Sequence, residues 1–300
     1  NALAGSFRTR LMSLAAAGLL AASAVPIQGA MQADKSTGPL KIVDALFEDV
    51  DGFPVAHMEL KAGGEAVLTF RVEGFERLTG KGENGLPESW VRLQYEVEMR
   101  DPGGVLVQPT KAGDYENLLG PLDDKWRPLI HWTADVPDWA PTGNYPIRIR
   151  IRDSVGDKNA EQSVTLRVIG ESVAPSSTLQ AENLQFARSD RGPWSSQRYF
   201  ALQDPVYVRF HVVGFGFAPG NQVSVEQDWS VLDAEGKVVV SKENAVTEQL
   251  HSFYPTRFLT TQFRLDFDNP KPGPYTLHIT LRDRTGDQTA SVDAPFNLRP

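Results

Sequence analysis

The chain contains one strand sequence twice, and this repeat constrains the fold more than any other feature. Residues 145–153 read Tyr-Pro-Ile-Arg-Ile-Arg-Ile-Arg-Asp, and residues 275–283, 130 positions later, read Tyr-Thr-Leu-His-Ile-Thr-Leu-Arg-Asp. In both places a Gly lies two residues before the Tyr, and an Asp-x-x-Gly-Asp turn follows. We therefore expect two tandem copies of one β-rich domain, each large enough to bury its own core.

The repeated segment alternates apolar and polar residues, which is typical of a strand with one buried and one solvated face. A second repeated pair, residues 66–75 and 206–215, alternates in the same way. No segment shows a sustained helical period, so the pattern predicts antiparallel sandwiches with about seven strands per copy. The expected strands of copy one are residues 40–47, 66–75, 91–99, 105–109, 129–136, 144–153 and 162–169.

Copy one carries an insertion between its second and third strands, within residues 76–90. Its Gly, Pro and Asn residues predict a loop. Residues 80–85 of this segment fit the dinucleotide pattern G-x-G-x-x-G. That pattern binds a pyrophosphate only where a strand ends and a helix begins, so we expect a flexible loop without a nucleotide.

The N-terminus has the order of a secretory signal peptide. Arg8 and Arg10 precede an apolar run at 11–22, followed by small residues and a Pro. The run is too short to span a bilayer comfortably, so no membrane insertion is expected after cleavage. The predicted organisation is a signal peptide at 1–30, a disordered lead at 31–39, domains at 40–169 and 178–300, and a Pro- and Ser-containing linker at 170–177.

Composition restricts the compartment and the partners. The chain has no Cys, so no disulfide stabilises it, and this favours a bacterial exported protein in the periplasm or outside the cell. Its net charge of −8 becomes −8 − 2 = −10 when Arg8 and Arg10 leave with the signal peptide. Such a surface repels phosphate backbones, which argues against nucleic acid and anionic membranes as partners.

Two short motifs resemble the immunoglobulin and fibronectin type III-like sandwiches of exported bacterial proteins. Residues 141–145, Pro-Thr-Gly-Asn-Tyr, and residues 272–275, Pro-Gly-Pro-Tyr, are similar to the Pro-Gly-x-Tyr entry to the sixth strand of that fold. The resemblance implies two tandem seven-stranded antiparallel immunoglobulin-like sandwiches, each with a tyrosine corner. Ile147 and Leu277 stand where an antibody domain has Cys. The pattern also resembles macroglobulin-type sandwiches, although the thioester Cys is missing.

Metal and catalytic sites find little support in the sequence. Asp153 and Asp157, like Asp283 and Asp287, are weak calcium candidates, because two carboxylates supply too few ligands; we expect turn-capping residues instead. The five His residues are scattered, with His211 expected on an outward strand face, so no zinc site or cofactor is predicted.

No catalytic constellation is evident either. The acidic group at Asp123, Asp124, Asp135 and Asp138 has no implied cleft to place two carboxyls face to face. The chain lacks a Gly-x-Ser-x-Gly elbow and has no Cys nucleophile, so we expect no enzyme activity.

Tryptophans give the best candidate binding site. Trp90, Trp126, Trp132 and Trp139 all lie in copy one, and copy two has Gln262 and Asn269 at the positions of the last two. Such residues stack on sugars or anchor protein partners, or else they are core residues of the fold.

The expected role is non-catalytic binding or scaffolding through protein–protein contacts in the envelope or outside the cell. One alternative is a carbohydrate-binding accessory module that binds polysaccharide through these tryptophans. A second alternative is a protease inhibitor that inserts the loop at 80–85.

Overall fold

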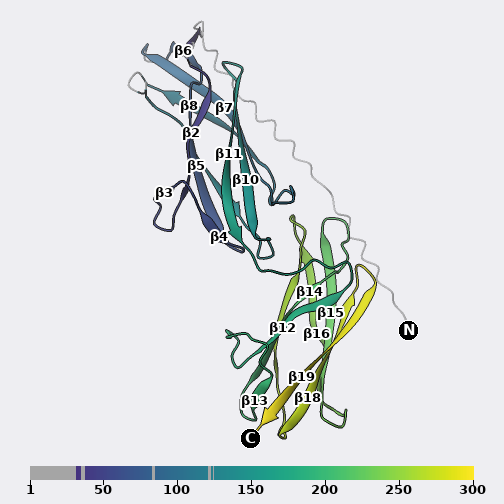
Figure 1. The fold of residues 1–300 in the computed structure, drawn as a ribbon. Helices are drawn as coiled ribbons and strands as arrows, with labels where there is room; N and C mark the ends of the chain where they lie inside the picture. The colour runs from purple at the N-terminus through teal and green to yellow at the C-terminus, as the bar shows by residue number, and fades with distance from the viewer. Residues whose placement is uncertain (1–31, 35–37, 83–84, 121–122, 124) are drawn as a thin grey trace, which may run out of the picture.

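The computed structural model describes residues 32–34, 38–82, 85–120, 123 and 125–300 (Figure 1). Within these ranges the chain is all-β, as expected, and no helix long and apolar enough to cross a membrane is found there. The expected signal peptide, residues 1–30, lies outside the described residues. In the segment expected to be disordered, 31–39, Gln32–Asp34 form a short strand.

Residues 32–169 are called the N-terminal half. Its strands are β1 (Gln32–Asp34), β2 (Lys41–Glu48), β3 (Pro54–Val55), β4 (Glu59–Lys61), β5 (Glu65–Glu73), β6 (Arg77–Lys81), β7 (Pro87–Met99), β8 (Lys111–Leu119), β9 (Leu129–Asp135), β10 (Gly143–Asp153) and β11 (Lys158–Ile169). One sheet has the order β3-β2-β5-β9. The other has the order β1-β6-β7-β10-β11-β4, and β8 also pairs with β7.

Residues 179–299 are called the C-terminal half. Its strands are β12 (Gln180–Ala187), β13 (Tyr199–Ala201), β14 (Val206–Val213), β15 (Gln222–Leu232), β16 (Val238–His251), β17 (Leu259–Leu265), β18 (Gly273–Asp283) and β19 (Gln288–Arg299). They form sheets of order β12-β14-β17 and β13-β19-β18-β15-β16. Figure 1 shows the two halves one after the other along the chain, joined by residues 170–178.

Each half has its own core between its two sheets, and the alternation of the repeated strand builds it. Ile147 and Ile149 of β10 are fully buried in the same core as Phe70 of β5. Leu277 of β18 is fully buried in the same core as Phe210 of β14. Because successive strand residues point to opposite faces, the intervening Arg and Thr side chains of β10 and β18 face away from the core.

Both tyrosine corners are present. The Tyr145 hydroxyl donates to the carbonyl of Pro141 at 2.8 Å, and the Tyr275 hydroxyl donates to the carbonyl of Lys271 at 2.9 Å. The four-residue separation is the same in both halves, so each Tyr holds the turn that leads into its own strand.

A buried aspartate ties the two sheets together at the opposite end of each half. Asp153 Oδ2 accepts the amide of Glu76 at 2.7 Å, and its Oδ1 accepts the amide of Val155 at 3.0 Å. Asp283 does the same with the amides of Gly216 at 2.6 Å and Thr285 at 2.9 Å. Each carboxylate thus joins its hairpin turn to the chain leaving the other sheet.

The glycine before this tie is required by close backbone packing. Gly74 and Gly214 have φ of +78° and +75°. A Cβ on Gly74 would lie 2.0 Å from the Pro39 carbonyl oxygen, and one on Gly214 would lie 1.9 Å from that of Thr178. The repeated Gly-Phe pair is therefore explained by packing rather than by a ligand.

Two local predictions were wrong. The described residues of the 76–90 segment, 76–82 and 85–90, are mostly paired: β6 pairs with the start of β7, opposing Leu78 to Trp90, and the Gly82 amide donates to the Leu86 carbonyl at 2.9 Å. The Gly-rich pattern belongs to this hairpin. The strand expected at 105–109 is a single bridge of Leu106 to Arg100, and the strand lies at Lys111–Leu119 instead. Pro109 has no amide proton for a ladder, which favours a later start.

We expect Asp153→Ala to lower the free energy of unfolding of the N-terminal half by about 2–4 kcal/mol, because two amides lose a buried charged acceptor. Asp157→Asn is the matched control. Its side chain is 84% exposed and its φ is +49°, a conformation that Asn tolerates, so a change below about 0.5 kcal/mol is expected. Urea unfolding of both variants checks this, and equal losses would contradict the tie.

Candidate functional site

A cleft of about 460 Å³ lies where the two halves meet. Its lining is mostly aromatic, proline and aliphatic, with few charged groups, and comes from both halves and the linker. The lining residues are Val105, Trp139, Pro141, Glu171, Val173, Pro175, Ser176, Gly214, Phe215, Phe217, Tyr254, Pro255, Thr256, Arg257 and Phe258. Apolar clefts at domain junctions with a few polar groups are the usual form of a binding site.

The wall of the cleft is fixed by a hydrogen-bonded cluster across the junction. The carboxylate of Asp101 is fully buried, and its Oδ2 accepts from the Tyr254 hydroxyl and from Arg257 Nη2, each at 2.7 Å. Its Oδ1 accepts the amide of Val105 at 2.8 Å. Asp101 belongs to the N-terminal half and the other two side chains to the C-terminal half, so the cluster links the halves.

Tyr254 is the central member of this cluster. It is 2% exposed and packs in the core of the N-terminal half, although it belongs to the C-terminal half. Burial, together with the hydrogen bond to Asp101, raises the pKa of Tyr254 to about 12. Burial, with Tyr254 and Asp101 nearby, also raises the pKa of Tyr145. Both phenols therefore stay protonated at neutral pH and act as hydrogen-bond donors rather than bases.

The linker is held at another wall of the cleft. Glu171 Oε2 lies 2.7 Å from Nε2 of His211, and its Oε1 accepts from Arg209 at 2.6 Å. His211 is 3% exposed, with Nδ1 3.1 Å from the Thr260 hydroxyl and its ring against Phe258. The expectation of an outward, solvated His211 was wrong, because the linker and the 251–258 loop cover this face of β14.

The four predicted tryptophans do not come together. Trp139 lines the cleft, while Trp132 is 4% exposed in the core of the N-terminal half. Trp90 is half-buried on β7 between β6 and β8. Trp126 packs beside Tyr115, with ring centroids 6.0 Å apart, at a separate open hollow of about 620 Å³.

The four weak calcium candidates fall into two buried and two exposed residues. Asp153 and Asp283 are buried and their oxygens accept backbone amides. Asp157 and Asp287 have positive φ and are exposed in the turns. Among the described residues, no group of three or more acidic, His or Cys side chains is placed to hold a metal.

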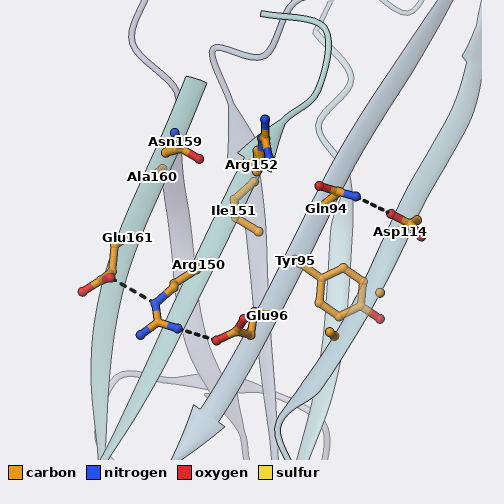
Figure 2. A pocket seen from close by; sticks show the side chains of 12 residues that line it. Gln94, Tyr95, Glu96, Asp114, Arg150, Ile151, Arg152, Asn159, Ala160 and Glu161 are labelled. Carbon is orange, nitrogen blue, oxygen red and sulfur yellow. Dashed lines mark hydrogen bonds and ion pairs between the residues drawn. The ribbon is translucent and has the colours of Figure 1, made fainter. Parts of the chain in front are cut away.

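A further hollow, of about 830 Å³, is a different kind of surface. It crosses β8, β7, β10 and β11, and Figure 2 shows Arg150 between Glu96 and Glu161, and Gln94 beside Asp114. Arg150 pairs with Glu96 and with Glu161, the latter at 3.3 Å, and Gln94 donates to Asp114 at 3.1 Å. Since these groups satisfy each other, the hollow is a solvated ion-pair ladder on a sheet face rather than a set of unmet ligand contacts.

Sequence reasoning missed Asp101, Tyr254 and Arg257. The only available signal was the loop His-Ser-Phe-Tyr-Pro-Thr-Arg-Phe at 251–258, where three aromatic residues occur in a segment without strand alternation. Aromatic residues in a loop at one end of a sandwich indicate a contact beyond that sandwich.

No protein-family model and no curated protein matches this chain. Solved structures do show a likeness to this chain, three of them as follows. The C-terminal domain of the antigen I/II polypeptide BspA of Streptococcus agalactiae has 8% identity and a TM-score of 0.27 over 87% of this chain and 100% of that one. The C-terminal domain of the antigen I/II-family protein AspA of Streptococcus pyogenes has 10% identity and a TM-score of 0.25, over 86% and 99%.

The third structure is dimeric latent PorU of Porphyromonas gingivalis, with 13% identity and a TM-score of 0.27 over 87% of this chain and 24% of that one. At these identities the likeness concerns the fold alone, and at these TM-scores it says nothing about function.

We expect Tyr254→Ala to destabilise the N-terminal half by about 3 kcal/mol, because it removes a buried aromatic side chain from that core. The two halves should also move more freely, seen as a broader distance distribution in small-angle X-ray scattering. Phe253→Ala, 52% exposed in the same loop, is the control and should change neither quantity. A compact, equally stable Tyr254→Ala variant would show that the cluster does not hold the junction.

The free energy of unfolding of the C-terminal half should depend on pH through the protonation of His211. Burial, opposed by Glu171 and reinforced by Arg209, lowers the pKa of His211 below its usual value of about 6.5. Folding therefore favours the neutral ring, and this contribution is present above about pH 6.5 and lost as the pH falls through the lowered pKa. His211→Gln should flatten the fall of unfolding free energy between about pH 7 and 5, whereas His57→Gln, at an exposed position, should retain it.

Proposed function

We propose that the chain is a non-catalytic, exported protein of the bacterial envelope or extracellular space that binds a protein partner in the cleft between its halves. The observation that carries this proposal is the junction cluster of Asp101, Tyr254 and Arg257. It holds apolar walls from both halves in one arrangement, so little ordering free energy is spent when a partner binds.

Exposed apolar groups at the cleft favour a protein partner. Phe217 is 48% exposed and Val105 is 41% exposed, and both line the cleft. With the half-buried Trp139 they offer the aromatic and aliphatic surface on which protein hot spots form. The partner would insert an apolar side chain here and place polar groups near Arg257, whose side chain is 43% exposed.

The chemistry of the cleft favours binding over catalysis. The Asp101 carboxylate already accepts three hydrogen bonds, and Tyr254 remains protonated at neutral pH. A general base must reach a substrate proton, and the fully buried Asp101 carboxylate cannot, while the Tyr254 phenol keeps its own proton.

We also propose that the halves are tandem immunoglobulin-like sandwiches with bounds 40–169 and 178–300. The separate cores, the paired tyrosine corners and the paired aspartate ties support this reading. Export is supported by the charged, apolar and small-residue order of residues 1–30 and by the absence of Cys.

Polysaccharide binding is the second candidate, and the hollow beside Trp126 favours it. The Trp126 and Tyr115 rings lie there with Arg71, Arg127 and Asp44. Aromatic rings flanked by charged hydrogen-bonding groups suit a sugar, which has both apolar and hydroxyl-bearing faces.

Affinity capture from the host's envelope and secreted fractions tests the first candidate. We expect a partner retained by the parent chain to be reduced at least tenfold by Phe217→Glu, which places a charge in an apolar cleft. Val238→Glu, an equally exposed apolar residue on β16, is the matched control and should retain the partner. Equal retention of the partner by both variants would show that the cleft is not the binding site.

The same affinity capture distinguishes protein binding in the cleft from polysaccharide binding beside Trp126. Trp126→Ala should leave protein capture unchanged if the cleft is the site. If purified cell-wall polysaccharide is retained by the parent chain and released by Trp126→Ala, with no protein captured, the carbohydrate function replaces the protein-binding one.

A further inference from the structure

Two equivalent loops of the halves carry opposite charge. One follows β2 at residues 49–53, Asp-Val-Asp-Gly-Phe, and the other follows β12 at residues 188–198, Arg-Ser-Asp-Arg-Gly-Pro-Trp-Ser-Ser-Gln-Arg. They are equivalent because each lies between the first long strand of its half and a short strand that pairs in parallel with the last one, β4 with β11 and β13 with β19. The repeat therefore supplies an acidic loop and a basic loop at the same place in the fold.

The acidic loop presents both charge and apolar surface. Asp49 Oδ1 accepts the amides of Asp51 at 3.0 Å and Phe53 at 2.8 Å, which fixes the turn. Val50 is 99% exposed and Phe53 is 66% exposed, which is unusual for two nearby apolar residues of a soluble domain. The Asp51 side chain projects into solvent beside them.

The basic loop presents arginines. Arg191 and Arg198 are exposed, and neither forms an ion pair with a carboxylate in the described part of the chain. Arg299 lies over the Tyr199 ring at 4.0 Å, and Arg188, although paired with Asp204 at 2.8 Å, donates to the Tyr199 carbonyl. Arg188, Arg198 and Arg299 therefore lie around the start of β13, and Arg191 is exposed earlier in the loop.

We propose that two copies of this chain associate through the acidic loop of one and the basic loop of the other. Charge selects this contact, because a chain of net charge −8 repels its own copies over most of its surface. The basic loop is a site that an acidic surface of a second copy approaches favourably. Val50 and Phe53 add apolar area that can pack on Pro193 and the partly exposed Trp194.

The positions of the loops allow both contacts to form at once. In Figure 1, β3 lies on the left side of the upper half and β13 on the left side of the lower half, and each follows one of the two loops. When a second copy faces this edge in the antiparallel direction, each acidic loop meets a basic loop. Such a pair is symmetric and closed.

Pairing of copies through the edge strand β16 is disfavoured. A bulge interrupts its pairing with β15 between Gln227 and Trp229, and Asn244 within it has φ of +46°. The Asn244 amide is used by Asp228 Oδ1 at 2.8 Å. A bulge of this kind breaks the straight edge that strand addition from another copy needs.

The contact should be weak and sensitive to salt. Exposed ion pairs contribute little each, and screening at 0.1 M salt acts over about 10 Å. We therefore expect association at roughly 100 µM chain and low ionic strength, with the monomer favoured at about 0.5 M salt.

Sedimentation velocity of the mature chain, with charge reversals, tests the proposal. Asp51→Lys and Arg191→Glu should each lower the association constant about tenfold, since each places like charges together. The double variant should recover association, because the lysine introduced in one copy then faces the glutamate introduced in the other. Glu235→Lys and Lys237→Glu, in the turn between β15 and β16, make the same charge changes elsewhere and should behave as the parent chain.

Each outcome of this experiment either supports or overturns the proposed association. A chain that stays monomeric at all concentrations in low salt overturns the proposal, as do single variants that associate like the parent. A double variant that keeps the parental circular dichroism but does not recover association also overturns it. Failure here leaves the cleft proposal intact, because Phe217 and Trp139 lie in neither loop.

Discussion

One buried carboxylate of the N-terminal half accepts hydrogen bonds from the C-terminal half, and the rest of this arrangement depends on that contact. Asp101 has no exposed side-chain surface, and a buried charge persists only when its oxygens are satisfied. One oxygen is satisfied within its own half by Val105, and the other only by Tyr254 and Arg257 of the other half. The orientation of the halves, and with it the shape of the cleft, follows from that requirement.

Much of the fold was predictable because it rests on short-range periodicity. The alternation of β10 and β18 identified their inward faces, and the Tyr near the start of each strand forms the corner that the resemblance implied. The hairpin at β6 and β7 was not predictable, because Gly and Pro signal turns and say little about whether the flanking residues pair. The junction was missed for another reason: contacts between domains leave no period in either sequence.

The two tryptophans that copy two lacks, Trp132 and Trp139, have different places in the structure. Trp132 is absent from copy two, yet it is a core residue of the N-terminal half. Repeated domains fill their cores with different side chains, so a difference between copies does not by itself indicate a binding residue. Trp139, also absent from copy two, lines the cleft together with residues of the other half.

The position of Tyr254 constrains the order in which the parts of this chain can complete their folding. The core of the N-terminal half includes a side chain that lies 85 residues beyond the end of β11, at Ile169. A chain that emerges from its N-terminus can form both sheets of that half early, but it cannot fill the core or satisfy Asp101 until the 251–258 loop has also emerged. The first half is thus completed only after β12 to β16 of the second have emerged, and the interval before completion is when its open end is most exposed to proteases and to misassembly.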